Sequence, residues 1–132
     1  MKPRAWTAAG LTLAFLLALT ALPPAARADR PGEVVIGGVL CFRIREVSKE
    51  GSIDQRVNHI HEVFAKHLGG PYHKFTIKRV GRRRHLYLNG DFVVAVWPAD
   101  AKATGYKSVQ SLARLWMKRL DKGFRAAHAG VG

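Results

Sequence analysis

The chain has 132 residues, with 22 Lys and Arg against nine Asp and Glu, so its formal net charge is +13 at pH 7. This length allows one domain with a single modest core. The only cysteine, Cys41, excludes an intramolecular disulfide framework. The basic excess draws the protein toward anionic surfaces, although the same charge also fits a solvated surface with no dedicated ligand.

The first 28 residues have the pattern of a secretory signal peptide. Lys2 and Arg4 precede an apolar run over residues 8–22, and Ala26-Arg27-Ala28 offers small residues at the positions that signal peptidase reads. The run of 15 residues is shorter than the ~20 that a membrane-spanning helix needs. We therefore expect cleavage after residue 28, rather than an uncleaved anchor, and a periplasmic or extracellular protein that can associate peripherally with the membrane. Loss of this segment leaves 104 residues with 19 basic and nine acidic side chains, a net charge of +10.

A linker over 29–33 and a first strand within 34–45 are expected next. Apolar Leu40, Phe42 and Ile44 alternate with Cys41, Arg43 and Arg45, as in a strand with one apolar face. Gly37-Gly38 interrupts this segment and predicts a bulge, or two short strands in one line. The apolar neighbours of Cys41 favour a buried, inert thiol. An exposed Cys41 would allow an intermolecular disulfide.

A helix over 52–68 follows. Ser52 and Gln55 form a capping box at its start, and Gly69-Gly70-Pro71 ends it. Its apolar stripe consists of Ile53, Val57, Ile60, Phe64 and Leu68. The stripe predicts one buried helix face.

Three strands then precede a second helix. Phe75 and Ile77 alternate with basic and polar residues, and Asn89-Gly90 predicts a two-residue hairpin. That hairpin would pair Leu88 with Asp91, Tyr87 with Phe92, and Leu86 with Val93. Pro98 ends the return strand, and Asp100 is expected to cap the turn that follows, rather than to bind a ligand.

The last predicted helix spans about 108–127, before a flexible tail at 128–132. Lys118, Arg119, Lys122 and Arg125 load its C-terminal half with positive charge, which complements the helix dipole. The fold class is therefore α+β, in the order β-α-β-β-β-α, as a single domain over 34–127 with two helices on one face of a small antiparallel or mixed sheet. The expected buried helix positions are Ile53, Val57, Ile60, Phe64, Leu112, Trp116 and Leu120.

The histidines offer the main route to a catalytic or metal-binding interpretation. His59 and His61 are two residues apart on a helix and cannot share one ion. His67 and His73 flank the Gly-Gly-Pro turn, and His85 is isolated. No nucleophile or zinc-hydrolase motif is present. We expect no enzyme activity, no metal and no cofactor. The alternative is a small metal-binding protein or hydrolase that folding assembles from these histidines.

A basic cluster is the sharpest surface feature. It consists of Lys78, Arg79, Arg82, Arg83 and Arg84. Arginine binds phosphate and carboxylate groups bidentately, so we interpret the protein as a binding or accessory module for an anionic envelope polymer, for lipid headgroups or for an acidic envelope protein. Alternatively, the three arginines form a solvated loop that opposes aggregation of strand edges. A nucleic-acid partner would require that the protein is not exported.

Several short segments together resemble a known family. They are the strand Leu40-Cys41-Phe42-Arg43-Ile44-Arg45, the helix start Ser52-Ile53-Asp54-Gln55-Arg56-Val57, the strand Gly90-Asp91-Phe92-Val93-Val94-Ala95-Val96 with Ala99-Asp100-Ala101, and Leu112-Ala113-Arg114-Leu115-Trp116. The set resembles the extracytoplasmic N-terminal domain of some bacterial small-conductance mechanosensitive channel proteins, and similar free-standing exported proteins of unknown function. Val57 and Trp97-Pro98 depart from that pattern. The resemblance implies an α+β fold and an envelope location, and no channel activity, because the chain has no pore region.

Overall fold

The computed structural model of the chain describes residues 31–131, with side chains described through Gly130. Pro31–Gly132 forms one compact unit. The predicted signal peptide at 1–28 lies outside the described residues. None of the helices within the described part has the length and apolarity needed to cross a membrane.

The elements follow the predicted order with two differences, because a hairpin of two strands replaces the first predicted strand and a short helix is added. They are β1 (Glu33–Ile36), β2 (Val39–Arg43), α3 (Ile53–His67), β3 (Phe75–Val80), β4 (Arg83–Leu88), β5 (Asp91–Val96), α4 (Pro98–Thr104) and α5 (Val109–Val131). The α+β class is confirmed, and the short helix α4 is the added element. The strands form two antiparallel sheets, β1-β2 and β3-β4-β5, instead of one.

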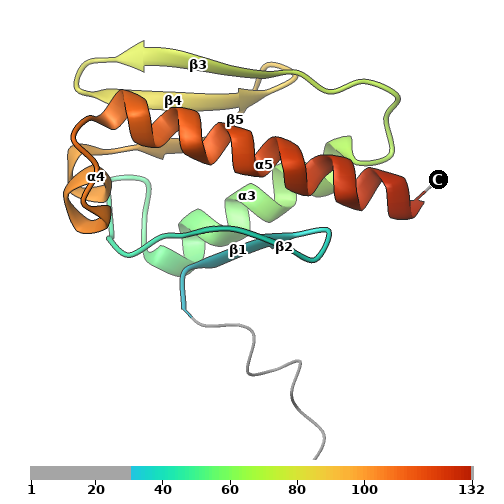
Figure 1. Cartoon of the computed structure of the whole chain (residues 1–132), viewed down its shortest axis with the longest axis horizontal. Helices are drawn as coiled ribbons and strands as arrows, with labels where there is room; N and C mark the ends of the chain where they lie inside the picture. The colour runs from blue at the N-terminus through green and yellow to red at the C-terminus, as the bar shows by residue number, and fades with distance from the viewer. Residues whose placement is uncertain (1–30, 132) are drawn as a thin grey trace, which may run out of the picture. The chain divides into compact units, whose positions relative to one another are not determined.

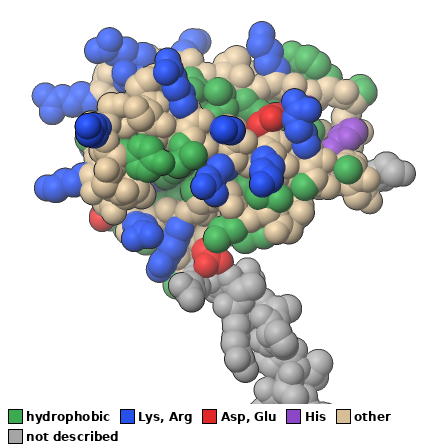
Figure 2. Space-filling view, viewed as in Figure 1, with side chains coloured by type: hydrophobic (Ala, Val, Ile, Leu, Met, Phe, Trp, Pro, Cys, Tyr) green, Lys and Arg blue, Asp and Glu red, His purple; other side chains and the backbone are tan. Residues whose placement is uncertain are grey.

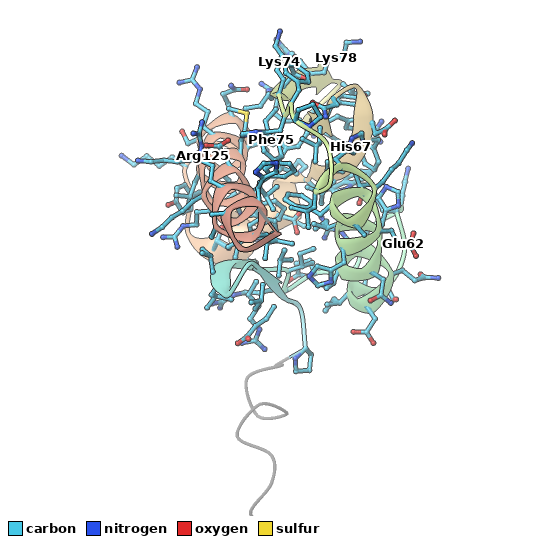
Figure 3. The ribbon with its side chains drawn as sticks, turned by 90° about the vertical axis from the view of Figure 1, so that its right-hand side faces the viewer. Glu62, His67, Lys74, Phe75, Lys78 and Arg125 are labelled. Carbon is cyan, nitrogen blue, oxygen red and sulfur yellow. The ribbon has the colours of Figure 1, made fainter. Side chains whose placement is uncertain are left out.

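The two long helices lie between the two sheets (Figures 1 and 3). Both α3 and α5 pack on the same face of the three-stranded sheet, and the β1-β2 hairpin packs against their other side. The apolar stripe of α5 forms the centre of this arrangement. Trp116 stacks on Phe42 of β2 with ring centroids 4.1 Å apart, and Phe124 lies 6.0 Å from Phe64 of α3.

The first hairpin turns at Gly37-Gly38, so the predicted bulge, or single line of two strands, at this point is wrong. Both glycines have positive φ, 58° and 78°, and two such residues in succession make the tight turn that joins antiparallel strands. A bulge does occur in β2, between Leu40 and Phe42, because Val35 pairs with Leu40 while Val34 pairs with Phe42. Cys41 is the extra residue between them. The strand also begins at Glu33, inside the predicted linker.

Cys41 is buried, as predicted, with 1 % of its surface exposed. Its thiol lies within hydrogen-bond distance of the Arg119 carbonyl oxygen, at 3.4 Å. Desolvation by burial raises the pKa of the thiol to about 11. Since the thiolate is the reactive form, Cys41 is unsuited to a disulfide between chains in the folded protein.

The helix start of α3 is confirmed. The Ser52 hydroxyl accepts from the Gln55 main-chain N–H at 3.1 Å, and the Gln55 side-chain oxygen Oε1 accepts from the Ser52 N–H at 2.8 Å. Of its predicted stripe, Ile60 and Phe64 are fully buried, whereas Ile53 and Val57 are only partly buried. The predicted buried positions of α5, Leu112, Trp116 and Leu120, are confirmed.

The second hairpin has the predicted turn and most of the predicted register. Asn89 and Gly90 both adopt positive φ, and Tyr87 pairs with Phe92. The predicted partner of Leu86 is wrong, because a register shift pairs Leu86 with Val94. The four residues from Val93 to Val96 are all buried, so both faces of this part of β5 are covered.

The predicted flexible tail is helical through Val131, because α5 continues past residue 127. His128 accounts for this extension. Its ring stacks on Phe124, with centroids 5.9 Å apart, and its Nε2 lies 3.0 Å from the Gly70 carbonyl oxygen. Contacts with the turn after α3 therefore hold the last turns of α5.

Gly123 lies at a close approach of α5 to the first hairpin. A Cβ atom there would lie 2.8 Å from the Ile36 Cβ and 3.0 Å from the Cys41 sulfur. We predict that Gly123→Ala destabilises the protein by about 1–3 kcal/mol through overpacking, although Ala is the better helix former by about 1 kcal/mol. Gly130→Ala is the matched control, since nothing lies near that Cβ position, and it should be neutral or slightly stabilising. Urea denaturation of both variants measures the difference, and equal stability would contradict the tight approach.

Candidate functional site

The predicted basic cluster is divided over a hairpin, and the predicted loop of three arginines is wrong. Lys78 and Arg79 lie on β3, and Arg83 and Arg84 lie on β4. Val80 pairs with Arg83, so only Gly81 and Arg82 form the turn. Gly81, with φ 60°, allows a two-residue connection. The chain therefore returns to the sheet at Arg83, and the last two of the three arginines lie in β4.

The side chains of the cluster also point to both faces of the sheet. Strand alternation places Lys78 and Arg83 on the face of the sheet away from the helices, and places Arg79 and Arg84 on the other. The Arg83 guanidinium lies 4.6 Å from the centre of the Trp97 ring, and its buried Nε has no hydrogen-bond partner. Arg84 donates to the Gln110 side chain at 2.6 Å. Both side chains therefore have structural contacts.

Lys78, Arg79 and Arg82 are the exposed members of the cluster. Lys78 also contacts β4, because its Nζ lies 5.9 Å from the centre of the Tyr87 ring. The five predicted residues thus separate into three that are exposed and two, Arg83 and Arg84, that are partly buried and help to hold the hairpin.

Helix α5 supplies a larger basic surface. Its exposed positions include Arg114, Lys118, Arg119, Lys122 and Arg125. The described side chains of α5 include one acid, Asp121, which pairs with Arg125 at 2.9 Å and with His73 at 2.8 Å. Burial raises the pKa of Asp121, but the bonds from Arg125 and His73 outweigh it, and the net shift is downward. Asp121 is therefore a charged carboxylate that offsets the charge of Arg125, while Arg114, Lys118, Arg119 and Lys122 remain exposed.

The two helices differ in charge, because α5 carries five Lys and Arg residues and one Asp, whereas the two acids of α3 are balanced by Arg56 and Lys66. Figure 2 shows Lys and Arg side chains spread over the face that carries α5, with few acidic ones. The end view places Arg125 on one side, Glu62 of α3 on the opposite side, and Lys74 and Lys78 at the top (Figure 3). We define the basic face as the exposed Lys and Arg residues of α5 together with Lys74, Lys78, Arg79 and Arg82, which lie along the adjoining outer strand β3 and its turn and point to both sides of the sheet.

A buried ion pair that the sequence analysis missed lies inside the fold. Arg56 of α3 is 1 % exposed and Asp100 of α4 is 2 % exposed. Two guanidinium nitrogens donate to the two Asp100 oxygens, at 3.0 and 2.9 Å. The predicted capping role of Asp100 is confirmed as well, since its Oδ2 accepts from the Trp97 N–H at 2.9 Å. The missed signal was the position of Arg56, one turn before Ile60 on the inward side of α3.

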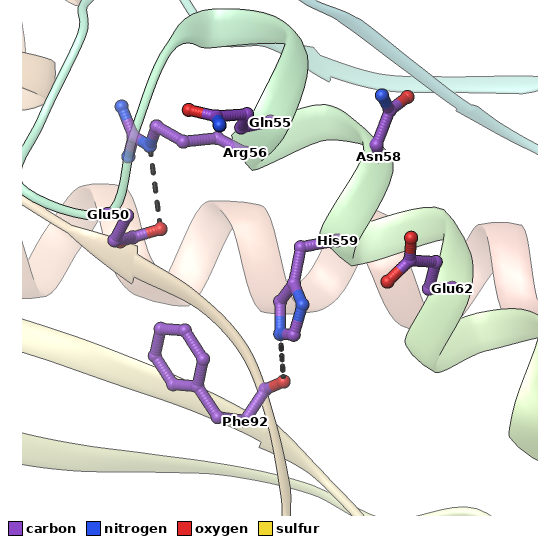
Figure 4. A pocket seen from close by; sticks show the side chains of 7 residues that line it. All are labelled: Glu50, Gln55, Arg56, Asn58, His59, Glu62 and Phe92. Atoms are coloured by element: carbon purple, nitrogen blue, oxygen red, sulfur yellow. Dashed lines mark hydrogen bonds and ion pairs between the residues drawn. The ribbon is translucent and has the colours of Figure 1, made fainter.

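Glu50 extends this network to a cleft of about 490 Å³ (Figure 4). One of its oxygens accepts from the Ala95 N–H at 2.8 Å and from the Trp97 indole N–H at 3.1 Å. The other lies 3.6 Å from Arg56 Nε. His59 also lines the cleft, with its Nε2 2.9 Å from the Phe92 carbonyl oxygen. These polar groups contact one another or the main chain, so the cleft has a structural explanation.

The histidines named as alternative ligands lie in separate contacts. His67 Nε2 lies 2.6 Å from Asp91, and this bond is the main cause that lowers the pKa of Asp91, followed by the bond from Lys66. His73 contacts Asp121, and burial, followed by the nearby Arg83 charge, lowers the pKa of His85. Within residues 31–131, no three His, Cys, Asp or Glu side chains are grouped so that they could hold a metal ion.

Comparisons of this chain with protein-family models, with curated proteins and with solved structures find no match. The resemblance to the channel domain therefore stays a prediction. Arg56 and Asp100 both belong to the segments that carry it, so the resemblance includes the two partners of the buried ion pair.

The buried pair generates a stability prediction. Asp100→Ala leaves the Arg56 charge buried without its partner, and should cost about 3–5 kcal/mol of unfolding free energy. The double variant Arg56→Met, Asp100→Ala removes both charges and should cost clearly less than the two single variants added together. Asp54→Ala, an exposed acid in the first turn of the same helix, should cost under about 1 kcal/mol. Additive costs in the double variant, measured by chemical denaturation, would contradict the pairing.

Proposed function

We propose that this protein is a non-catalytic binding or accessory module that attaches to an anionic partner through its basic face. The candidate partners are an anionic envelope polymer, lipid headgroups or an acidic envelope protein. The concentration of basic side chains on α5, compared with the balanced charges of α3, is the observation that carries the proposal. A general solubilising charge would be spread over both helices, whereas a one-sided charge orients the molecule toward an oppositely charged surface.

The contacts of the acidic side chains support this proposal. Asp100 and Glu50 interact with the buried Arg56, and Asp91 and Asp121 each pair with basic residues. Of these four acids, Asp121 is the one that pairs with a residue of the basic face, Arg125, so most of the positive charge of that face is not offset by them. The rival proposal, a histidine-dependent metal protein or hydrolase, is less favoured because the described residues contain no group of three His, Cys, Asp or Glu side chains that could hold a metal ion.

Location in the cell envelope is part of the proposal. Its support is the apolar segment over residues 8–22 followed by Ala26-Arg27-Ala28, together with the resemblance to an extracytoplasmic domain. Outside the cytoplasm the abundant anions are lipid headgroups, acidic polymers and acidic proteins, which are the partners named above.

Export predicts a defined N-terminus. N-terminal sequencing of the protein recovered from the periplasm or the medium should begin at Asp29. A chain found only in the cytoplasm that still begins at residue 1 would overturn the location and would reopen the nucleic-acid alternative.

The basic face predicts selective attachment to anionic vesicles. Vesicles that contain phosphatidylglycerol should bind the protein, phosphatidylcholine vesicles should not, and binding should fall as salt screens the charges over about 10 Å at 0.1 M. At ~1 kcal/mol per Lys or Arg, the variant Lys118→Gln, Lys122→Gln should bind about 30-fold more weakly. Gln preserves helix propensity, so folding should be unaffected.

The matched control is Lys49→Gln, Lys102→Gln, which removes the same charge from two exposed residues outside the basic face. Its affinity for the vesicles should change much less. Equal losses in the two double variants, in a sedimentation assay, would show that net charge alone acts and that the basic face is not a site.

A further inference from the structure

The two outer strands of the sheet β3-β4-β5 differ in what occupies their free edges. On β5, the Ala95 N–H donates to Glu50 at 2.8 Å and the Ala95 carbonyl accepts from Arg56 at 2.9 Å. The Phe92 carbonyl oxygen lies 2.9 Å from His59 Nε2. Side chains therefore occupy the main-chain groups of β5 that face away from β4, and no further strand can pair there.

The edge of β3 has the opposite character. The Asn89 N–H donates to the Lys74 carbonyl at 2.9 Å, so the main chain of Lys74 faces the neighbouring hairpin strand. Alternation along an antiparallel pair then points the N–H and C=O groups of Phe75, Ile77 and Arg79 away from β4. No strand of the described residues pairs with β3 on that side, and β3 forms the top of the view in Figure 1.

The open edge is basic. Lys74, Lys78 and Arg79 are exposed along it, and the sequence has no Asp or Glu between residues 71 and 90. Positive charge on an edge strand protects against pairing with a second copy of the same strand, because like charges would then face each other. The same charge is complementary to an acidic strand.

We propose that the edge of β3 receives an extended acidic segment of a partner protein as a fourth strand. This inference rests on the proposed function and selects the acidic protein among its candidate partners. The segment would exchange main-chain hydrogen bonds with Ile77 and its outward-facing neighbours. Acidic side chains at every second position would face Lys74 and Lys78, and the apolar side chains between them would lie beside Phe75 and Ile77.

The side-chain directions fit such a segment. Lys74 and Lys78 both point to the top of the view in Figure 3, on the same side of the strand, while Phe75 points inward between the helices. Addition of a strand to a sheet edge takes its affinity from main-chain bonds and its specificity from alternate side chains. A lipid headgroup or a flexible anionic polymer would use the charges alone, and the main-chain groups would stay free.

Two substitutions at one residue separate these cases. Arg79→Pro and Arg79→Ala remove the same charge, but only proline also removes the outward N–H, and it leaves the bonds from β3 to β4 in place. The probe is a synthetic nine-residue peptide of alternating Glu and Val, with affinity measured by calorimetry. We expect Arg79→Pro to bind the peptide at least about fivefold more weakly than Arg79→Ala. A fivefold loss of affinity is the effect of removing roughly one hydrogen bond.

Amide hydrogen exchange on the unsubstituted protein provides a second measurement that does not depend on the proline variant folding. The peptide should slow exchange at Phe75, Ile77 and Arg79, and anionic vesicles should not. Equal peptide affinity of the two variants, or unchanged exchange at these three amides, overturns the fourth strand. If vesicle binding still depends on Lys118 and Lys122, the proposed function survives that result. Loss of both the peptide and the vesicle responses overturns both proposals.

Discussion

The rest of the structure depends on the buried guanidinium of Arg56. Besides Asp100, it donates to the Glu46 carbonyl at 2.8 Å and to the Ala95 carbonyl at 2.9 Å. One side chain of α3 thereby joins the preceding loop, β5 and α4. An ion removed from water is tolerated only when its partners surround it. These segments must therefore assemble together, because any one of them out of place would leave the charge or a carbonyl without a partner.

The local features of this fold could be predicted from the sequence, since each depends on neighbours in the chain. The capping box at Ser52 and the turn at Asn89-Gly90 are of this kind. The role of Arg56 could not, because its partner Asp100 is 44 residues away and no local pattern identifies it. The strand position of Arg83 was missed for a related reason: a run of arginines indicates a loop by composition, while the stacking of Arg83 on Trp97 is a tertiary contact.

The candidate site shows the same division between local and tertiary information. The sequence alone predicted the positive charges of the basic cluster and of α5, and these are the residues on which the proposed function relies. It could not predict that Arg84 would bond to Gln110, or that Arg79 would lie on the opposite face of the sheet from Lys78. Which charges remain free follows from the packing of α5 across the sheet, and only the fold determines that packing.

The buried network also determines which sheet edge remains open. Arg56 and Glu50 are held by Asp100 and the Trp97 indole, and the same two side chains contact the main-chain groups of Ala95. The interactions that assemble the interior thus close the edge of β5 as a by-product. In the part of the chain that the structure describes, β3 is then the remaining outer strand of this sheet, and basic residues lie along it. The buried ion pair and the exposed positive charge both follow from the positions of the few acidic residues in the chain.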